Sequence, residues 1–564
     1  MIYLIVSFLT FLITVITTPY LIQFLTERDL VDKPNVEDRR IHTSSVPRMG
    51  GIIIFAAVMV ITFLFYRDLS SKIFFVSGAL VVFGLGLVDD FKSVKWYVKF
   101  AFQSIAAIFL ILSLYQNNFT EIKFLGFTLL PWIDYIVLFI LIVGLLNSFN
   151  FMDGLDGLVT GYSLIVASMC FLLTLNSGNT FLSYLSASIV GTTLGFLKFN
   201  ANPARMFLGD SGSLTLGFLI SSLVIMISGS VSAGAQNQFI SYSNTIDLTF
   251  VIIALALPLA DTIRVIFVRL EKGNNLFLAD SSHFHHVLLN KKIRHKTVVL
   301  LIHIFSVMFV LLAIYYAKSS QITALIIFII LLDLFFSVQY ILGFLIKKEI
   351  LIAYSKVYNS IPDLIPKIYK NVMLPLVAFS LIVLFIFLIF NQIDKSNYYY
   401  NYFILLIIPS LFYSSTQLKR HNYYPELLVL INIVLFFLIT GLNGFFYKLY
   451  PVPLINQINF NQIFILVLSS TIILFVLFKE RVANIRLQFL TGSDLIISVL
   501  ILSIYVAVQF INLPDSYMIS DTLFRSYLVY LFYKILVVTL PKIHFPLYYV
   551  SFFIAVIAVL ISII

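Results

Sequence analysis

Asp210 stands in a polar segment, NANPARMFLGDSGSLTLG (Asn200 to Gly217), that separates two almost wholly apolar stretches of the chain. A glycine precedes this aspartate and Ser-Gly-Ser follows it, so a phosphate group could approach the backbone closely. The N–H groups that open the next helix would face such an anion, and a hard divalent cation beside the carboxylate would bridge phosphate oxygens. Taken alone, the segment also fits a polar connector that ends in a helix N-cap.

Two adjacent carboxylates, Asp89 and Asp90, end another apolar run. Neighbouring charges at a membrane interface are costly unless a cation or hydrogen bonds compensate them. Lys92, Lys95 and Lys99 follow, and they could neutralise the pair or bind anionic phosphates. The alternative is a helix end solvated by lipid headgroups, with lysine side chains that extend to the same headgroups.

A denser polar cluster lies in the segment NSFNFMDGLDGL, from Asn147 to Leu158. Its asparagines, Asn147 and Asn150, and its aspartates, Asp153 and Asp156, follow one another at a spacing of three residues. Such spacing places the four side chains on one face if helical turns persist. One Asp-Gly pair is an ordinary turn. Two such pairs beside two asparagines at the depth of a bilayer indicate a functional site.

Three histidines, His283, His285 and His286, follow Asp280 in a loop expected near the end of the first half. Histidines at this spacing can bind zinc, but no cysteine or closely placed fourth ligand accompanies them. Imidazole groups that donate to a phosphate or a sugar hydroxyl fit better beside the acidic segments. An ordinary exposed histidine cluster is the alternative.

The composition indicates a polytopic helical membrane protein. Of the 564 residues, 60% are hydrophobic and 11% are charged, and the mean hydropathy is +1.02. Soluble domains do not reach these values, so a water-soluble core is excluded. The single cysteine, Cys170, can form no internal disulfide. The first apolar segment lacks a basic n-region and a cleavage site, so we expect a retained helix rather than a signal peptide.

The net charge of +10 does not indicate a nucleic-acid partner, because the basic residues concentrate in alternate loops. Basic stretches occur at Arg28 to Arg48, Lys92 to Lys99 and Arg264 to Lys296, whereas Ser228 to Asp247 contains no Lys or Arg. Basic loops of membrane proteins favour the cytoplasmic side. The pattern therefore predicts an external N-terminus and places the polar motifs on the cytoplasmic face of the membrane.

Apolar stretches of about 20 residues, long enough to span a bilayer, define the expected architecture. The first half contains ten, near 2–25, 49–66, 71–88, 97–115, 133–149, 157–175, 180–198, 213–229, 247–268 and 298–317. The second half contains about eight more, near 321–346, 372–391, 402–416, 425–446, 460–478, 491–511, 521–540 and 546–563. Alternation around Gly126 predicts a short external hairpin between Asn117 and Trp132, and Lys347 to Lys370 is the best candidate for a boundary. We therefore expect an all-α polytopic membrane protein, with a ten-helix core followed by about eight further transmembrane helices.

Six motifs occur in order on the expected cytoplasmic side: PRMGG (Pro47 to Gly51), Asp89-Asp90, Lys99 with Gln103, NSFNFMDGLDGL, NANPARMFLGDSGS and DSSHFHH. Together they resemble the polyprenyl-phosphate N-acetylhexosamine-1-phosphate transferase superfamily. The resemblance covers residues 1–317, so residues 318–564 are expected to be an additional transmembrane bundle of unknown role. The D-x-x-H-x-H-H spacing is similar to that of the branch that starts O-antigen, teichoic-acid and related polymers with N-acetylglucosamine, rather than to the peptidoglycan branch.

The resemblance implies an integral membrane enzyme that moves N-acetylhexosamine-1-phosphate from a UDP-sugar to a polyprenyl phosphate such as undecaprenyl phosphate, with release of UMP. UDP-GlcNAc is the favoured sugar donor, and UDP-GalNAc and other UDP-HexNAc species stay open. The resemblance implies Mg²⁺, with Mn²⁺ as the alternative, held by Asp210 and Asp153, while Asp89 and Asp90 serve the attacking lipid phosphate or the metal. It assigns the substrate contacts to Lys99, Asn147, Asn150, Asp153, Asp156, Asn200, Arg205, Phe207, His283, His285 and His286. Among these, Phe207 would stack on uracil, and the histidines would close the pyrophosphate and sugar side.

Phosphoryl transfer needs positioning and charge neutralisation more than covalent help. A phosphomonoester has a second pKa near ~6, so the lipid phosphate is already largely a dianion at neutral pH. We therefore expect direct attack on the β-phosphorus, aided by Asp89 or Asp90, and the sequence leaves a covalent aspartyl-phosphate route open.

A transporter or flippase of lipid-linked sugars is the competing class of protein. Its polar residues should lie near the bilayer midplane, whereas those of this chain cluster toward one surface. For residues 318–564 we expect a separate bundle that binds a membrane partner or another chain. The predicted topology and the resemblance together indicate a bacterial cytoplasmic membrane, with the active site on its cytoplasmic face.

Overall fold

The computed structural model describes residues 2–32, 45–119, 121–175, 179–231, 245–271, 283–291, 293–318, 321–347, 364–378, 460–483, 492–511 and 516–539. Contacts divide the chain into two compact units, Met1–Lys347 with Thr491–Ile511, and Lys348–Leu490 with Asn512–Ile564. The first unit extends past the expected end of the core at residue 317, because it includes α13 (Gln321–Lys347) and also α21 (Gly492–Ile511). The helices expected near 402–416, 425–446 and 546–563 lie outside the described residues, as does residue 379 onward of the helix expected near 372–391.

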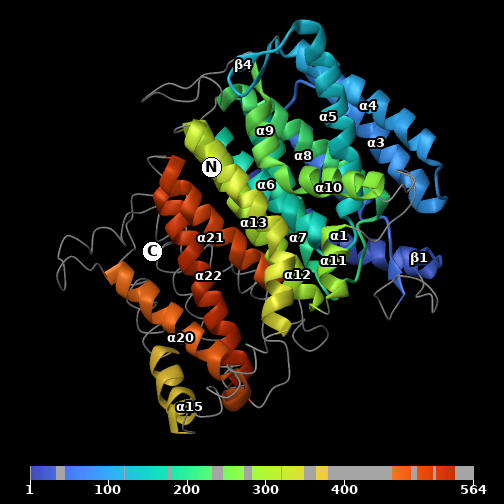
Figure 1. Ribbon diagram of the computed structural model, residues 1–564. Helices are drawn as coiled ribbons and strands as arrows, with labels where there is room; N and C mark the ends of the chain where they lie inside the picture. Colours follow the sequence, from blue (N-terminus) through green and yellow to red (C-terminus); the bar gives the residue numbers. More distant parts are fainter. Residues whose placement is uncertain are drawn as a thin grey trace, which may run out of the picture. The chain divides into compact units, whose positions relative to one another are not determined.

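Apolar helices, most of them long, build the first unit (Figure 1). Besides α13 and α21 they are α1 (Ile2–Glu27), α2 (Gly51–Phe65), α3 (Ile73–Phe91), α4 (Trp96–Gln116), α5 (Pro131–Met152), α6 (Leu158–Thr174), α7 (Thr180–Asn200), α8 (Gly209–Val231), α9 (Leu248–Ala254), α10 (Ala256–Glu271) and α12 (His295–Lys318). Among the described residues, eight helices are long and apolar enough to cross a membrane, or nine if α9 and α10 form one bent span. The prediction of an all-α polytopic membrane protein is confirmed.

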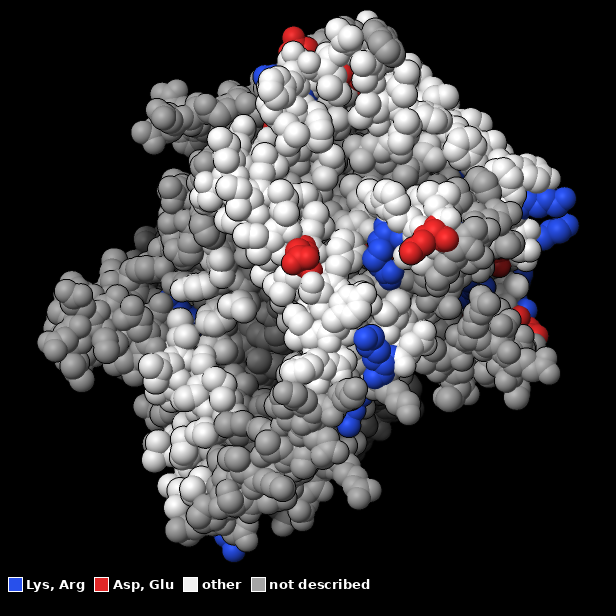
Figure 2. Space-filling view, in the orientation of Figure 1, with Lys and Arg blue, Asp and Glu red and all other residues white. Residues whose placement is uncertain are grey.

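The outer surface of these helices is apolar, as a surface in contact with lipid requires. Val60 on α2 and Ile140 on α5 are examples, with 64% and 63% of their surface exposed. Charged side chains are sparse over the described part of the face in Figure 2. The burial pattern therefore agrees with helices that face lipid on one side and one another on the other.

α8 lies at the centre of the first unit. Its apolar span is entirely buried and packs against α2, α3, α5 and α6. Ser211, Ser213 and Thr215 are among its fully buried side chains. Small residues of this kind allow neighbouring helices to approach closely. The packing thereby brings the ends of α3 and α5 to the N-terminus of α8.

The predicted hairpin is confirmed as β3 (Glu121–Phe124) paired antiparallel with β4 (Phe127–Thr128). Its turn residues, Leu125 and Gly126, have positive φ angles of 51° and 84°, a region that glycine enters without steric cost. The sequence did not predict β5 (Thr245–Asp247), which adds to β3 in parallel orientation. A separate short pair, β1 (Val31–Asp32) and β2 (Val46–Pro47), is antiparallel.

The prediction of a single helix at 247–268 is wrong. The structure contains two helices there, α9 and α10, whose axes differ in direction by 84°. Pro258 lacks the N–H that would bond to the carbonyl of Ala254, so the helix breaks at Leu255. A second difference concerns the histidine segment, which was expected to be a loop. From Phe284 to Asn290 it forms a short helix, α11.

The second unit, taken by itself, contains α15 (Leu364–Ile368), a π-helical turn at Tyr369–Met373, α20 (Phe460–Ala483) and α22 (Ser516–Thr539). α20 packs against α22. The hydroxyl of Tyr369 donates to the carbonyl oxygen of Thr471 on α20 at 2.7 Å. The helices predicted at 460–478 and 521–540 correspond to α20 and α22.

Candidate active site

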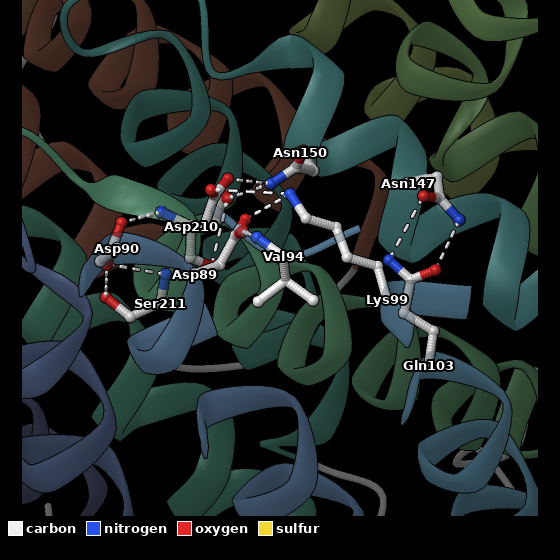
Figure 3. Close-up of polar contacts among 10 residues, drawn as sticks. Asp89, Asp90, Val94, Lys99, Gln103, Asn147, Asn150, Asp210 and Ser211 are labelled. Carbon is white, nitrogen blue, oxygen red and sulfur yellow. Dashed lines mark hydrogen bonds and ion pairs between the residues drawn. The ribbon is translucent and has the colours of Figure 1, made fainter. Parts of the chain in front are cut away.

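Polar side chains converge where α3 and α5 end and where α4 and α8 begin (Figure 3). The Lys99 ammonium forms an ion pair with Asp89 Oδ2, and its Nζ lies 3.8 Å from Asp210 Oδ2. Asn150 Nδ2 donates to Asp210 Oδ1 at 2.5 Å. Asp89 Oδ1 accepts from the backbone N–H of Val94 at 2.5 Å. Four helices thus place two carboxylates and one ammonium group side by side.

The members of this cluster differ in exposure. The side chain of Asp89 is 3% exposed, whereas those of Lys99 and Asp210 are 27% and 25% exposed. The Asp89 and Asp210 carboxyl groups also lie within hydrogen-bonding reach of each other. Two carboxylates at such a distance favour a shared proton or a bound cation. A substrate would therefore meet Lys99 and Asp210 first, with Asp89 behind them.

Asp90 makes different contacts from its neighbour Asp89. Asp90 Oδ1 accepts from the backbone N–H of Asp210 at 2.8 Å, and Oδ2 accepts from Ser211 N at 3.1 Å and Ser211 Oγ at 2.5 Å. A carboxylate at a helix N-terminus satisfies otherwise unpaired N–H groups and offsets the positive end of the helix dipole. Asp90 therefore holds the first turn of α8, and with it Asp210, in place.

Gln103 and Asn147 join α4 to α5 through reciprocal amide hydrogen bonds of 3.2 and 2.9 Å (Figure 3). Gln103 is 2% exposed, and Asn147 Nδ2 also donates to the carbonyl oxygen of Val143 at 2.9 Å. Lys99 precedes Gln103 by one helical turn, and Asn150 follows Asn147 by about one turn. The structure thus places Asn147, expected among the substrate-binding residues, in a helix contact that sets the spacing of the cluster.

The loop between α5 and α6 carries Asp153 and Asp156. Burial raises the pKa of Asp153 to about 8, and the negative charge of Asp210 contributes next. Asp153 therefore lies close enough to Asp210 for the two charges to interact. Asp156 Oδ2 accepts from Asn202 Nδ2 at 2.8 Å and from the backbone N–H of Ala204 at 3.2 Å. Asp156 thus ties this loop to the one between α7 and α8.

Asn200, at the end of α7, is 4% exposed. Its Oδ1 accepts from Gly157 N at 3.2 Å and from Thr160 Oγ1 at 2.8 Å, while its Nδ2 donates to Met206 O at 3.1 Å. Protein groups therefore contact both ends of the amide. The sequence analysis expected Asn200 in the nucleotide pocket. In the structure its hydrogen bonds join the start of α6 to the segment before α8.

The PRMGG motif holds the segment before α8 through backbone hydrogen bonds. Phe207 N donates to Pro47 O at 2.8 Å, and Gly50 N donates to Phe207 O at 3.1 Å. The Arg205 side chain is exposed and that of Phe207 is half-buried. Both lie in the segment that leads into Asp210, where the sequence predicted substrate contacts.

The three histidines lie at the start of α11, beside the loop between α5 and α6. His285 is 2% exposed, and a Cβ added at Gly154 would collide with its ring. Burial lowers the pKa of His285 to about 3, with repulsion by His286 as the next cause. His285 is therefore neutral at neutral pH. The rings of His283 and His285 are stacked with centroids 5.9 Å apart, whereas Asp280 lies outside the described residues.

Asp261 on α10 is a site residue that the sequence analysis missed. Its Oδ2 is 3.0 Å from His283 Nδ1, and its Oδ1 accepts from Phe284 N at 2.9 Å. The carboxylate thus orients the His283 ring and accepts a hydrogen bond from the first N–H group of α11. A usable signal existed, because an aspartate inside the apolar stretch at 247–268 is costly in a membrane helix without a specific role.

Comparison with known proteins adds an independent observation. The model of glycosyl transferase family 4 matches residues 72–228, which include Asp89, Asn150 and Asp210. A relative in Bacillus subtilis (strain 168), a probable undecaprenyl-phosphate N-acetylglucosaminyl 1-phosphate transferase, is 33% identical over 342 residues, covering 60% of this chain and 91% of the relative. The chain belongs to glycosyl transferase family 4.

Two other relatives show the range of similar proteins. A decaprenyl-phosphate N-acetylglucosaminephosphotransferase of Mycobacterium leprae (strain TN) is 30% identical over 288 residues, covering 47% of this chain and 72% of the relative. A phospho-N-acetylmuramoyl-pentapeptide-transferase of Bacillus subtilis (strain 168) is 32% identical over 234 residues, covering 38% of this chain and 72% of the relative. The predicted superfamily is confirmed.

A divalent cation is compatible with this family 4 site. In the part of the chain that the structure describes, no group of three or more His, Cys, Asp or Glu side chains could hold a metal ion. Mg²⁺ does not require such a cage, because it commonly uses one or two carboxylates together with water and substrate phosphates. The paired carboxyl groups of Asp89 and Asp210, with Asp153 nearby, are donors of this kind.

Gly86 explains how α3 and α8 come close enough to form the site. A Cβ at Gly86 would lie 2.5 Å from the carbonyl oxygen of Asp210, whereas a Cβ at Gly84, on the same helix, would meet no atom within 4 Å. The two glycines therefore form a matched pair, one at a close helix contact and one in open space.

We expect Gly86→Ala to displace the first turn of α8, to destabilise the protein by about 1–3 kcal/mol and to lower transferase activity strongly. Gly84→Ala should keep full activity and be neutral or slightly stabilising, because alanine favours a helix over glycine by up to about 1 kcal/mol. Thermal unfolding in detergent and release of UMP measure the two effects. Equal behaviour of both variants would show that the close contact at Gly86 does not position Asp210.

Proposed function

We propose that this protein transfers N-acetylhexosamine-1-phosphate from a UDP-sugar to a membrane polyprenyl phosphate, with release of UMP, and so initiates a lipid-linked cell-envelope glycan. The observation that carries the proposal is the cluster of Asp89, Lys99, Asn150 and Asp210, which lies within the residues matched by the family model. Its carboxylate, ammonium and amide groups suit a reaction between two phosphate-bearing substrates.

N-acetylglucosamine is the sugar that the comparisons favour. Two of the relatives are named as transferases of N-acetylglucosamine phosphate, and one of them covers 60% of this chain. The phospho-N-acetylmuramoyl-pentapeptide-transferase covers 38%. The histidine spacing of this chain supports the same choice, so UDP-GlcNAc is the first donor to test.

In the reaction, an oxygen of the lipid phosphate attacks the β-phosphorus of the UDP-sugar. A new P–O bond forms while the bond from the β-phosphorus to the bridging oxygen breaks, and UMP leaves. Lys99 offers a positive charge to the incoming phosphates. Asp89 is set behind Lys99, where it orients the lysine and receives any remaining proton of the lipid phosphate.

The residues of the cluster alone carry more negative than positive charge, which would repel the substrates. A Mg²⁺ ion held by Asp210 and Asp153 would neutralise the pyrophosphate when bound. Asn150 orients the Asp210 carboxylate, because its Nδ2 donates to Asp210 Oδ1. The other oxygen, Oδ2, then lies on the side of Lys99. Mn²⁺ is the alternative ion.

The site belongs at the cytoplasmic face of a bacterial cytoplasmic membrane, where the basic loops lie according to the charge pattern. Asp89 and Asn150 lie within the last turn of their helices, and Lys99 and Asp210 lie within the first turn of theirs. This placement near one end of each span favours an interfacial enzyme over a transporter, whose binding groups would lie at the bilayer midplane.

Purified protein in detergent, supplied with polyprenyl phosphate, Mg²⁺ and a panel of UDP-sugars, tests the proposal. We expect release of UMP that requires the lipid, is fastest with UDP-GlcNAc and stops when a chelator removes the cation. Lack of UMP from every sugar, in protein shown to bind the lipid, would contradict the enzyme and favour the transporter. A phosphorylated protein trapped by rapid quenching would instead contradict the direct route.

A further inference from the structure

We propose that α21, a helix of the C-terminal region, forms one wall of a pocket beside Asp156 and positions the loops that bind the UDP-sugar. The inference rests on the proposed function. It departs from the expectation that residues 318–564 form a bundle separate from the core. α21 lies outside the residues that the family model matches.

The first observation is the packing of α21 against α6 and α12 within one compact unit. Ile496 is 2% exposed and fills a notch formed by two glycines at the start of α6. A Cβ at Gly157 would lie 3.5 Å from Ile496 Cδ1, and one at Gly161 would lie 3.1 Å from Ile496 Cγ2. Gly157 follows Asp156 directly, so Ile496 supports the loop that carries this aspartate.

The second observation is a contact between the start of α21 and the loop after α7. A Cβ at Gly492 would lie 3.2 Å from the carbonyl oxygen of Asn202 and 3.7 Å from the Cβ of Ala201. Asn202 in turn donates to Asp156 Oδ2 at 2.8 Å. The first residue of α21 therefore lies against the backbone of a residue that holds Asp156.

The third observation is electrostatic. Asp494 is 4% exposed and lies close enough to Lys296 for their charges to interact. Lys296 follows His295, whose Nε2 accepts from the backbone N–H of Asp156 at 3.2 Å. The charge of Asp494 on α21 thus attracts Lys296 at the start of α12, and the neighbouring His295 contacts the Asp156 backbone.

These contacts surround a small pocket with room for about one water molecule. Its polar and backbone lining comes from Asp156, Asn202, His295, Lys296 and Gly492. Val299, Leu300, Leu495 and Ile496 form the apolar side. Asn202 and His295 both contact Asp156, so these side chains fix the loop that carries this aspartate. Ile496 acts on the Asp156 loop through Gly157 and Gly161, and Asp494 acts through Lys296, so both are positioning residues.

Kinetics of Asp494→Asn and Ile496→Ala test the inference. We expect the KM for the UDP-sugar to rise by about 3- to 10-fold in each, because misplaced loops lose binding geometry, while kcat and the KM for polyprenyl phosphate stay within about twofold. Asp494→Glu should restore most of the affinity, since it keeps the charge. Leu502→Ala is the control, because this residue lies on the same helix and is 54% exposed. An unchanged KM in both variants, or an equal change in the control, would overturn the inference.

A cross-link decides the position of α21 without any enzyme assay. Cys170 is the only cysteine, so Cys170→Ala gives a background free of thiols. In that background we expect Gly492→Cys with Ala201→Cys to form a disulfide on mild oxidation, because a Cβ at Gly492 lies 3.7 Å from Ala201 Cβ and disulfides commonly need about 3.5–4.5 Å. Leu502→Cys with Ala201→Cys should form none. Failure of the first pair to cross-link would overturn the inference.

The two experiments separate the inference from the proposed function. If wild-type protein releases no UMP while the first pair cross-links, the proposed reaction fails and α21 still lies on the loop after α7. If wild-type protein is active and the pair does not cross-link, the reaction stands and the role of α21 is lost. When both succeed, the cross-linked enzyme should keep the wild-type KM for the UDP-sugar, because the bond fixes the contact already present.

Discussion

Replacing Asp210 with asparagine is expected to lower the rate of UMP release by about 10³-fold, because it removes a carboxylate at which charge is neutralised during phosphoryl transfer. Asparagine has nearly the same shape and keeps an oxygen that can accept the hydrogen bond from Asn150. The first turn of α8 should therefore stay in place. Single-turnover measurements of UMP release, together with thermal unfolding, separate lost chemistry from lost structure.

Asp68→Asn is the matched control for this change. Asp68 lies before the opposite end of α3, is exposed, and accepts a hydrogen bond from Ser70 Oγ at 2.7 Å. Its substitution should leave the rate within about twofold, as surface changes far from a site usually do. Wild-type activity in Asp210→Asn would remove this carboxylate from the proposed cation site. A large loss in both variants would indicate a general effect of the lost negative charge.

We expect Asp90→Asn to destabilise the protein and Asp89→Asn to change its stability little. Asp90 accepts hydrogen bonds from two backbone N–H groups and a hydroxyl of the first turn of α8. An amide has only one accepting oxygen, so Asp90→Asn leaves a buried donor unpaired at a cost of about 1–3 kcal/mol. The displaced Asp210 should also lower UMP release by about 10²-fold.

Asp89→Asn should lower UMP release by a similar factor with little loss of stability. Its carboxyl group lies beside that of Asp210, and removing one of two neighbouring negative charges relieves repulsion while it takes a counterion from Lys99. Ser211→Ala is the control for the hydroxyl alone, and we expect less than about tenfold loss of activity. Melting temperature and kcat measured on all three variants check the division of roles. An Asp90 variant with wild-type stability would contradict the role of Asp90 in holding α8.

The sequence was sufficient to predict most of the candidate site by residue. Asp89, Asn150 and Asp210 stand out because charged and amide groups beside apolar spans are costly without a role. The family comparison then confirmed the superfamily to which these motifs point. The motifs do not identify Asp261, because it lies inside an expected helix and its partner His283 comes 22 residues later.

The roles of adjacent residues could not be predicted in the same way. Neighbouring positions on a helix point about 100° apart, so Asp89 and Asp90 meet different partners, and those partners lie up to 121 residues away. Which carboxylate faces Lys99 and which holds α8 follows from how α3 packs on α8. That packing depends on Gly86, whose missing side chain leaves room for the Asp210 backbone.

The amino-acid sequence by itself determined most of the helical spans that the structure describes, the hairpin at Gly126 and the polar motifs, because apolar length, turn chemistry and charge are local properties of a chain. Only the tertiary structure decided the hydrogen bonds by which Asn200 joins α6 to the segment before α8, and the packing of α21 against α6 and α12. These features depend on contacts between segments far apart in the chain. The sequence of an apolar helix does not reveal whether the helix faces lipid or protein. The contact of Gly492 with the loop after α7 is visible only when the chain is folded.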